Sequence, residues 1–134
     1  MVFRNIIKKC FSTIRFTKSH EYIKYETGYY TLGITKFAAD SLGDIVFVSL
    51  PKKGNDIVKD EAILEVDSIK AVSEINTPIS GKIINVNDEL EDDPSLINKF
   101  PLDKGWIVQI ESVDNINDLN LMNDEEYDKY IKDC

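Results

Sequence analysis

The chain has 134 residues, 43% hydrophobic and 30% charged, which is enough for one soluble globular domain with a modest core. Its formal net charge of −8 disfavours nucleic acid as a partner, because an acidic surface repels phosphates, and suits a protein partner with a basic docking face. No apolar run approaches the roughly 20 residues of a membrane-spanning helix. The two cysteines, Cys10 and Cys134, are too few for a disulfide scaffold or a cysteine zinc site, and we expect Cys134 to be an inert terminal thiol.

The first 18 residues contain five basic side chains and no acidic one. On a helix, six apolar residues would share one face and four basic residues the other: Phe3, Ile6, Ile7, Cys10, Phe11 and Ile14 against Arg4, Lys8, Lys9 and Arg15. This pattern is typical of a mitochondrial targeting presequence. We therefore predict a presequence at residues 1–16, removed on import into the matrix, and a domain at residues 17–134 that folds without it. The alternative is a surface helix of the domain.

From residue 17 onward, short apolar segments separated by turn residues predict a chain rich in strands. The predicted strands lie at residues 29–34, 45–50, 62–66, 72–76, 82–86 and 106–110. Helices are predicted at residues 36–42, 93–100 and 124–134, the second beginning at the Asp93-Pro94 pair. Many short strands at this spacing favour a mainly β fold, an antiparallel sandwich or barrel.

The sequence contains no evident catalytic apparatus. A single histidine, His20, offers little for a metal site or a catalytic triad, and we expect it to be partly buried near the start of a strand. The six glycines are scattered singly rather than gathered in a phosphate-binding loop. The acidic residues at 89–93 indicate a solvated loop. We therefore expect a carrier or binding module rather than an enzyme, without a metal site.

One segment, residues 65–74, places a single lysine, Lys70, between two β-rich arms. A proline and a glycine, Pro78 and Gly81, follow the second arm. A lysine at the tip of a hairpin points into solvent, where a modifying enzyme can reach its amine. Taken alone, the same pattern also fits an ordinary exposed lysine in a turn.

Several short motifs in a fixed order make the chain similar to the H proteins of the glycine cleavage system. These are Thr17-Lys-Ser-His-Glu-Tyr22, Leu42-Gly-Asp-Ile-Val-Phe-Val-Ser-Leu-Pro51, Val66-Asp-Ser-Ile-Lys-Ala71, Pro78-Ile-Ser-Gly81, Leu96-Ile-Asn98 and Gly105-Trp106. Each motif is weak on its own, but their common order from residue 17 to residue 106 is highly specific. The resemblance therefore covers nearly all of the chain after the predicted presequence.

The resemblance implies a flattened antiparallel β barrel or sandwich of the biotinyl/lipoyl carrier type, with short helices and a C-terminal helix. It implies that Lys70 carries lipoate in amide linkage. The chain would then be a monomeric, non-catalytic shuttle that takes an aminomethyl group from glycine decarboxylase to aminomethyltransferase, after which dihydrolipoyl dehydrogenase reoxidises the dithiol. Lipoate-attaching enzymes would be further partners.

The resemblance also implies a cleft for the loaded arm, formed by Ser19, Glu21 and Glu74. Carboxylates there could give charge-assisted hydrogen bonds to the carried amine. The competing interpretation is that both glutamates are ordinary acids on a solvated surface. Two positions depart from the usual pattern: Asp67 stands where glutamate is usual, and Glu74 where aspartate is more typical.

Other carriers fit the sequence less well. A biotin carrier would have methionines beside its lysine, where Ile69 and Ala71 stand, and the lipoyl domain of a 2-oxo acid dehydrogenase would have an aspartate directly before it. Two alternatives stay open. The chain could chiefly donate lipoate to other apoenzymes, or it could be an interaction module whose Lys70 is unmodified.

Overall fold

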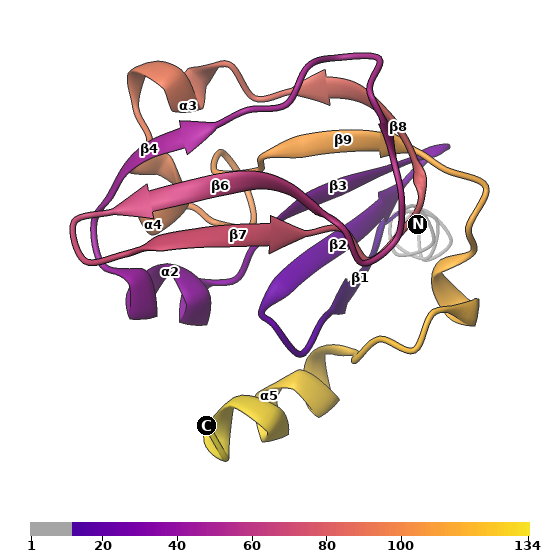
Figure 1. Ribbon diagram of the computed structural model, residues 1–134. Helices are drawn as coiled ribbons and strands as arrows, with labels where there is room; N and C mark the ends of the chain where they lie inside the picture. The colour runs from indigo at the N-terminus through magenta and orange to yellow at the C-terminus, as the bar shows by residue number, and fades with distance from the viewer. Residues whose placement is uncertain (1–11) are drawn as a thin grey trace, which may run out of the picture.

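Two antiparallel sheets lie face to face in the computed structural model, which describes residues 12–134 (Figure 1). The larger sheet has the strand order β1-β2-β3-β9-β8-β5, and the smaller sheet has the order β4-β6-β7. The strands are β1 (Ser12–Phe16), β2 (Glu21–Glu26), β3 (Tyr29–Ile34), β4 (Ile45–Ser49), β5 (Asp56–Ile57), β6 (Ala62–Ser68), β7 (Val72–Asn76), β8 (Gly81–Val86) and β9 (Val108–Glu111). The mainly β prediction is confirmed, as an open sandwich rather than a closed barrel.

Short helices join the strands, and a longer one ends the chain. They are α2 (Lys36–Leu42), α3 (Glu89–Asp92), α4 (Leu96–Lys99), the 3-10 helix η1 (Ile116–Asp118) and α5 (Asp124–Lys132). Helix α2 begins where the Thr35 side chain accepts a hydrogen bond from the Ala38 amide, and it ends at Gly43, whose φ is 81°. Among the described residues, no helix is both long and apolar enough to cross a membrane.

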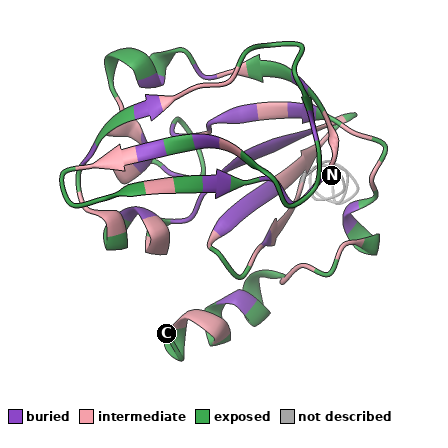
Figure 2. Ribbon diagram, viewed as in Figure 1, coloured by how far each residue is buried: buried purple, intermediate pink, exposed green. Residues whose placement is uncertain are grey.

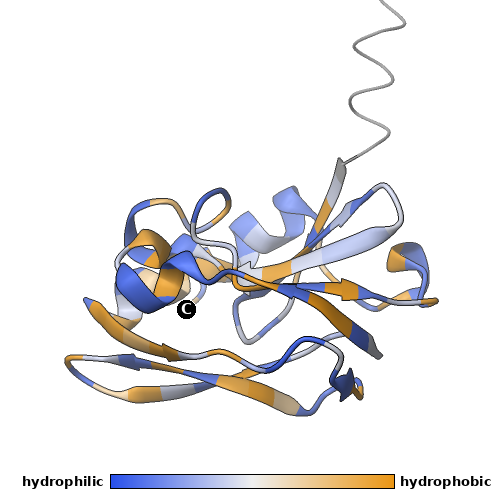
Figure 3. Cartoon of the chain, turned by 90° about the horizontal axis from the view of Figure 1, so that it is seen from above, coloured by the Kyte–Doolittle hydropathy of each residue, from blue (hydrophilic) through white to orange (hydrophobic). Residues whose placement is uncertain are grey.

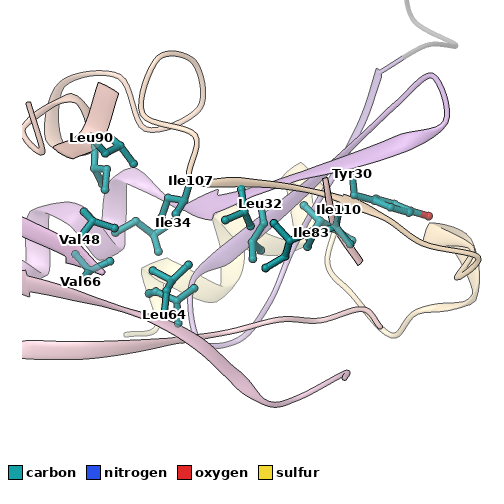
Figure 4. Packing of buried hydrophobic residues seen from close by; sticks show 14 of the residues in the cluster. Tyr30, Leu32, Ile34, Val48, Leu64, Val66, Ile83, Leu90, Ile107 and Ile110 are labelled. Atoms are coloured by element: carbon teal, nitrogen blue, oxygen red, sulfur yellow. The ribbon is translucent and has the colours of Figure 1, made fainter. Parts of the chain in front are cut away.

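The hydrophobic core fills the space between the two sheets (Figures 2 and 4). Alternate residues of β6, Leu64 and Val66, point inward and are buried together with Leu32 and Ile34 of β3. Each buried aliphatic side chain of this size contributes about 1.5–3 kcal/mol. The hairpin of β6 and β7, the lower layer in Figure 3, is therefore fixed against the larger sheet along its length.

The folded domain begins before the predicted boundary at residue 16. Residues 12–16, which the sequence placed in a helical presequence, form the edge strand β1, paired with β2 from Ser12 opposite Glu26 to Phe16 opposite Tyr22. Phe16 also exchanges two backbone hydrogen bonds with Met122, at 2.8 and 2.9 Å. The rest of the predicted presequence, residues 1–11, lies outside the described residues.

The prediction for residues 89–100 was right only in part. The acidic side chains at 89–93 are exposed, as expected, but residues 89–92 form the helical turn α3, which the fully buried Leu90 anchors. Asp93 does not begin a helix but ends α3, with its amide bonded to the Glu89 carbonyl at 2.9 Å. The next helix begins only at Leu96. Strand β2 and the very short β5 were not predicted from the sequence.

Candidate functional site

Lys70 lies in the tip turn, residues 68–71, which joins β6 to β7. The Ser68 hydroxyl accepts hydrogen bonds from the Lys70 and Ala71 amides, both at 3.1 Å, and the Ser68 amide donates to the Ala71 carbonyl at 2.8 Å. The serine side chain thus accepts hydrogen bonds from turn amides that are not paired with a neighbouring strand. Lys70 is held at an exposed position by a short, internally bonded turn.

The connection between α2 and β4 supports the tip turn from one side. The Asp44 carbonyl accepts a hydrogen bond from the Ile69 amide at 3.0 Å. A Cβ added at Gly43 would lie 3.2 Å from Lys70 Cε, so the absence of a side chain there leaves room for the aliphatic stem of the lysine. Lys70 therefore does not project from an isolated hairpin but lies against a second segment of the chain.

Asn98, in α4, fixes this supporting segment. Its Nδ2 donates to the Gly43 carbonyl at 2.9 Å, and its Oδ1 accepts from the Ile45 amide at 3.0 Å. One side-chain amide thus satisfies a backbone acceptor and a backbone donor on either side of Asp44. Asn98 lies in one of the sequence motifs, but its role was not predictable from the sequence, because its partners are more than fifty residues away in the chain.

The Lys70 amine is accessible for modification. Among residues 12–134, the lysines in ion pairs are Lys24 and Lys36, with Glu26 and Asp40 as their partners. Forming an amide removes the positive charge of a lysine, and here that change breaks no ion pair within the described chain. The residues present therefore suit an acyl group attached at Lys70.

The three residues predicted for the cleft line a single pocket of about 240 Å³. The pocket lies between α2, the start of β2 and β7, which is an edge strand of the smaller sheet. Its lining includes Ser19, Glu21 and Glu74, with His20 between the first two. The fold thus brings together the three residues predicted for the cleft, although Glu74 follows Glu21 by more than fifty positions.

Glu21 is buried, with only 3% of its surface exposed, and its side chain connects the two sheets. Its Oε1 accepts hydrogen bonds from the Thr17 and Ser19 hydroxyls, both at 2.6 Å. Its Oε2 accepts from the Asn76 amide at the end of β7, at 3.3 Å. Burial of a carboxylate requires such donors. The competing interpretation of Glu21 as a solvated surface acid is therefore wrong.

Glu74, by contrast, is exposed. It lies opposite Glu65 in the β6–β7 register, so the two carboxylates share one face of the hairpin.

A second, larger groove of about 700 Å³ lies beside the pocket and shares Ser19, Glu21 and Asn76 with it. Neither Thr17 nor Asn76 was identified from the sequence as a partner of Glu21. In the described part of the chain, no group of three or more side chains could hold a metal ion.

His20 adopts a left-handed backbone conformation, with a φ of 70°, in the turn before β2. Its Nδ1 hydrogen-bonds to the Tyr127 hydroxyl at 2.8 Å, and that hydroxyl also hydrogen-bonds to the Thr35 hydroxyl at 2.7 Å. The imidazole packs 4.5 Å from the Phe37 ring. The predicted partial burial is confirmed. Through this network, α5 holds the turn that leads into the pocket wall.

The position of His20 predicts a pH-dependent stability. Burial lowers its pKa below the ordinary value of 6.5, although the Glu21 carboxylate acts in the opposite direction. The unfolded chain therefore binds this proton more readily, so the free energy of unfolding should fall as pH drops through 6.5 towards the lowered pKa. Asparagine tolerates a positive φ and does not titrate. In urea denaturation at about pH 7.5 and about pH 5.5, His20→Asn should lose less stability than the unmutated chain. Equal losses would contradict the role of His20.

The known proteins to which this chain is similar in sequence and in fold belong to one family. The family model described as glycine cleavage H-protein matches residues 14–134. The glycine cleavage system H protein of Listeria monocytogenes is 43% identical over 116 residues, covering 87% of this chain and 93% of that one. The corresponding protein of Bacillus pumilus is 43% identical over 120 residues, covering 90% and 94%. The crystal structure of a glycine cleavage system H protein from Mycobacterium marinum superposes with a TM-score of 0.82 at 32% identity, covering 90% of this chain and 97% of that one. The chain belongs to the glycine cleavage H-protein family.

Proposed function

We propose that Lys70 is the residue through which this chain carries lipoate in the glycine cleavage system. The family is that of non-catalytic lipoyl carriers of this system, whose lipoate is covalently attached to a lysine. The observation that supports Lys70 is its place in the exposed, internally bonded tip turn, without an ion-pair partner in the described chain. When attached, lipoate supplies a dithiol that can carry an aminomethyl group between enzymes.

Membership of this system implies glycine decarboxylase and aminomethyltransferase as partners. A reconstitution tests the proposal. The chain, loaded with lipoate by a ligase, should support exchange of labelled bicarbonate into glycine by glycine decarboxylase, and the unloaded chain should not. If the loaded chain is inactive in this assay yet passes its lipoate to an unloaded 2-oxo acid dehydrogenase, the chain is a lipoate donor instead.

We also propose that the pocket of about 240 Å³ shelters the loaded arm, with Ser19, Glu21 and Glu74 facing its amine. Glu21 already accepts three hydrogen bonds, so its carboxylate is fixed in position before any ligand arrives. Glu74 is exposed and can adjust, which offsets the extra methylene it has relative to aspartate. A fixed carboxylate and an exposed carboxylate in one pocket suit a cationic amine.

Substitution of Glu74 by glutamine tests this pocket. An exposed carboxylate contributes about 0.2–1 kcal/mol to such an interaction, so Glu74→Gln should release ammonia from the loaded chain about 1.4- to fivefold faster when aminomethyltransferase is absent. Attachment of lipoate to Lys70 should be nearly unchanged. Glu65→Gln is the matched control, because Glu65 lies in register with Glu74 on the hairpin but does not line the pocket. The same release rate in both variants would argue against a role of the pocket in protecting the arm.

The remaining partners and the location are also proposals. We propose that dihydrolipoyl dehydrogenase and a lipoate-attaching enzyme act on the chain, that it works as a monomer, and that residues before Ser12 direct it to the mitochondrial matrix. The relatives named above are bacterial and give no support to this location. The basic, acid-free N-terminal sequence supports it, as does the start of the family match at residue 14. Fusion of residues 1–11 to a fluorescent protein should produce mitochondrial fluorescence, whereas diffuse fluorescence would count against it.

A further inference from the structure

Four large apolar side chains are exposed around the lysine, and we call them the tip patch: Val46, Phe47, Ile69 and Val72. Their exposed fractions are 54%, 55%, 67% and 63%. Ile69 lies in the tip turn itself, and the other three lie on β4 and β7, on either side of β6 (Figures 1 and 2). Hydrophobic colour marks the closed end of the hairpin in Figure 3. Several exposed apolar side chains gathered at one end of a small domain indicate a contact surface.

A β-bulge creates half of this patch. In a regular strand alternate residues point inward, so that an inward Ile45 would be followed by an inward Phe47. Instead, the register shifts between Ile45 and Phe47, Ile45 and Val48 are both buried, and the two residues between them are both exposed. Bulges commonly redirect side chains at functional sites. This one turns a phenylalanine away from the core and into solvent, which brings no gain to folding.

The register across the smaller sheet places Asp67 between Phe47 and Val72 in one row. Within residues 12–134, the buried side-chain oxygen without a hydrogen-bond partner is Asp67 Oδ1. Because this oxygen is already shielded from solvent, it adds no polar surface between the two exposed apolar side chains.

We infer that the tip patch is the docking surface for the enzyme that attaches lipoate to Lys70. The inference rests on the proposed function, because an enzyme that receives the Lys70 amine in its active site must cover the tip turn, where Ile69 is the adjacent residue. The complementary surface is thus an apolar rim around a channel that admits a lysine.

In the reaction that this docking permits, the Lys70 amine forms an amide bond with the carboxyl carbon of lipoate. The enzyme has first activated that carboxyl group with ATP as an acyl adenylate, and pyrophosphate has left. AMP is the leaving group in the second step, and the protons displaced from the lysine nitrogen go to solvent. No oxidant or reductant is needed.

Three substitutions test the docking surface. Phe47→Ser and Val72→Thr remove apolar surface from the patch, and threonine retains the branched side chain that suits a strand. Val58→Thr is the matched control: Val58 is also 54% exposed, but it lies before β6, at the end of the hairpin away from Lys70. Initial rates of lipoate attachment would be measured with a lipoate ligase, lipoate and ATP, at varied concentrations of the unloaded chain.

The patch variants should each lower kcat/KM about tenfold, mainly through a higher KM for the chain, as expected for central apolar contacts. The control should stay within about twofold, as expected for a residue outside the interface. Rates for Phe47→Ser and Val72→Thr equal to the control would overturn the docking surface and leave Lys70 as the lipoyl site. Failure of the unmutated chain to accept lipoate at Lys70 would overturn both. Val72→Thr keeps the test valid if Phe47→Ser proves unstable.

Discussion

Replacement of Lys70 by arginine is expected to abolish attachment of lipoate to the chain. Arginine keeps the positive charge and a similar length, but its guanidinium group stays protonated and cannot form the amide. The hydrogen bonds of the tip turn involve the Ser68 hydroxyl and backbone groups, so Lys70→Arg should leave the fold intact. Intact mass after incubation with ligase, lipoate and ATP would show the lipoyl mass on the unmutated chain and no added mass on the variant.

Another lysine in a turn provides the control. Lys53 is exposed and lies close to Pro51, in a turn without the motif around Lys70. Lys53→Arg should accept lipoate at the same rate as the unmutated chain, with the modified peptide containing Lys70. Lipoate found on the Lys70→Arg protein would refute the assignment. Protein isolated from its natural source with no added mass would instead favour an unmodified interaction module.

A chain that begins at Thr17 is expected to be much less stable than a chain that begins at Ser12. The shorter chain lacks β1 and with it Phe16, which is 6% exposed and stacks on Tyr127 at a centroid distance of 4.5 Å. Loss of a buried phenylalanine alone costs about 3–5 kcal/mol. It also frees the backbone groups of Met122, which bond to Phe16. The expected result is a large downward shift of the urea midpoint, or failure to fold.

The chain starting at Ser12 is the control, and it should retain nearly all the stability of the full chain. Equal midpoints for the two truncated chains would show that β1 does not stabilise the domain. The comparison also bears on processing, because removal of residues 1–16 would take β1 away. If the proposed presequence is cleaved, the mature N-terminus determined by mass spectrometry should lie at or before Ser12.

The elements with local signals were predictable from the sequence. Helix α2 was predicted with its observed bounds, and the structure shows that residues within the same short stretch, Thr35 and Gly43, cap its two ends. Strand β1 was misread because its residues continue an amphipathic, basic pattern that suits a helix equally well. What makes it a strand is its pairing with β2 and with Met122, and the second of these contacts spans most of the chain.

In the candidate site, too, residues within recognisable motifs were predicted, and residues that act through distant contacts were not. Lys70 and the pocket residues Ser19, Glu21 and Glu74 were identified by resemblance, and the fold brings the last three to one pocket. The residues that hold them in place were not identified from the sequence. Asn76 is 55 positions from Glu21, and Tyr127 is 107 positions from His20. Such contacts have no period or spacing in the sequence.

The stacking of Phe16 on Tyr127 also constrains the order in which the domain can fold. Phe16, in the first described strand, packs with its neighbour Tyr22 but stacks on Tyr127 of the last helix, so this cluster includes a contact of very high sequence separation. A ribosome releases β1 long before α5, and during that interval Phe16 lacks its stacking partner. The hydrogen bond between Tyr127 and His20 likewise forms only after synthesis of the whole chain. A nascent chain therefore contains the lysine hairpin before the turn that leads into β2 gains its support from α5.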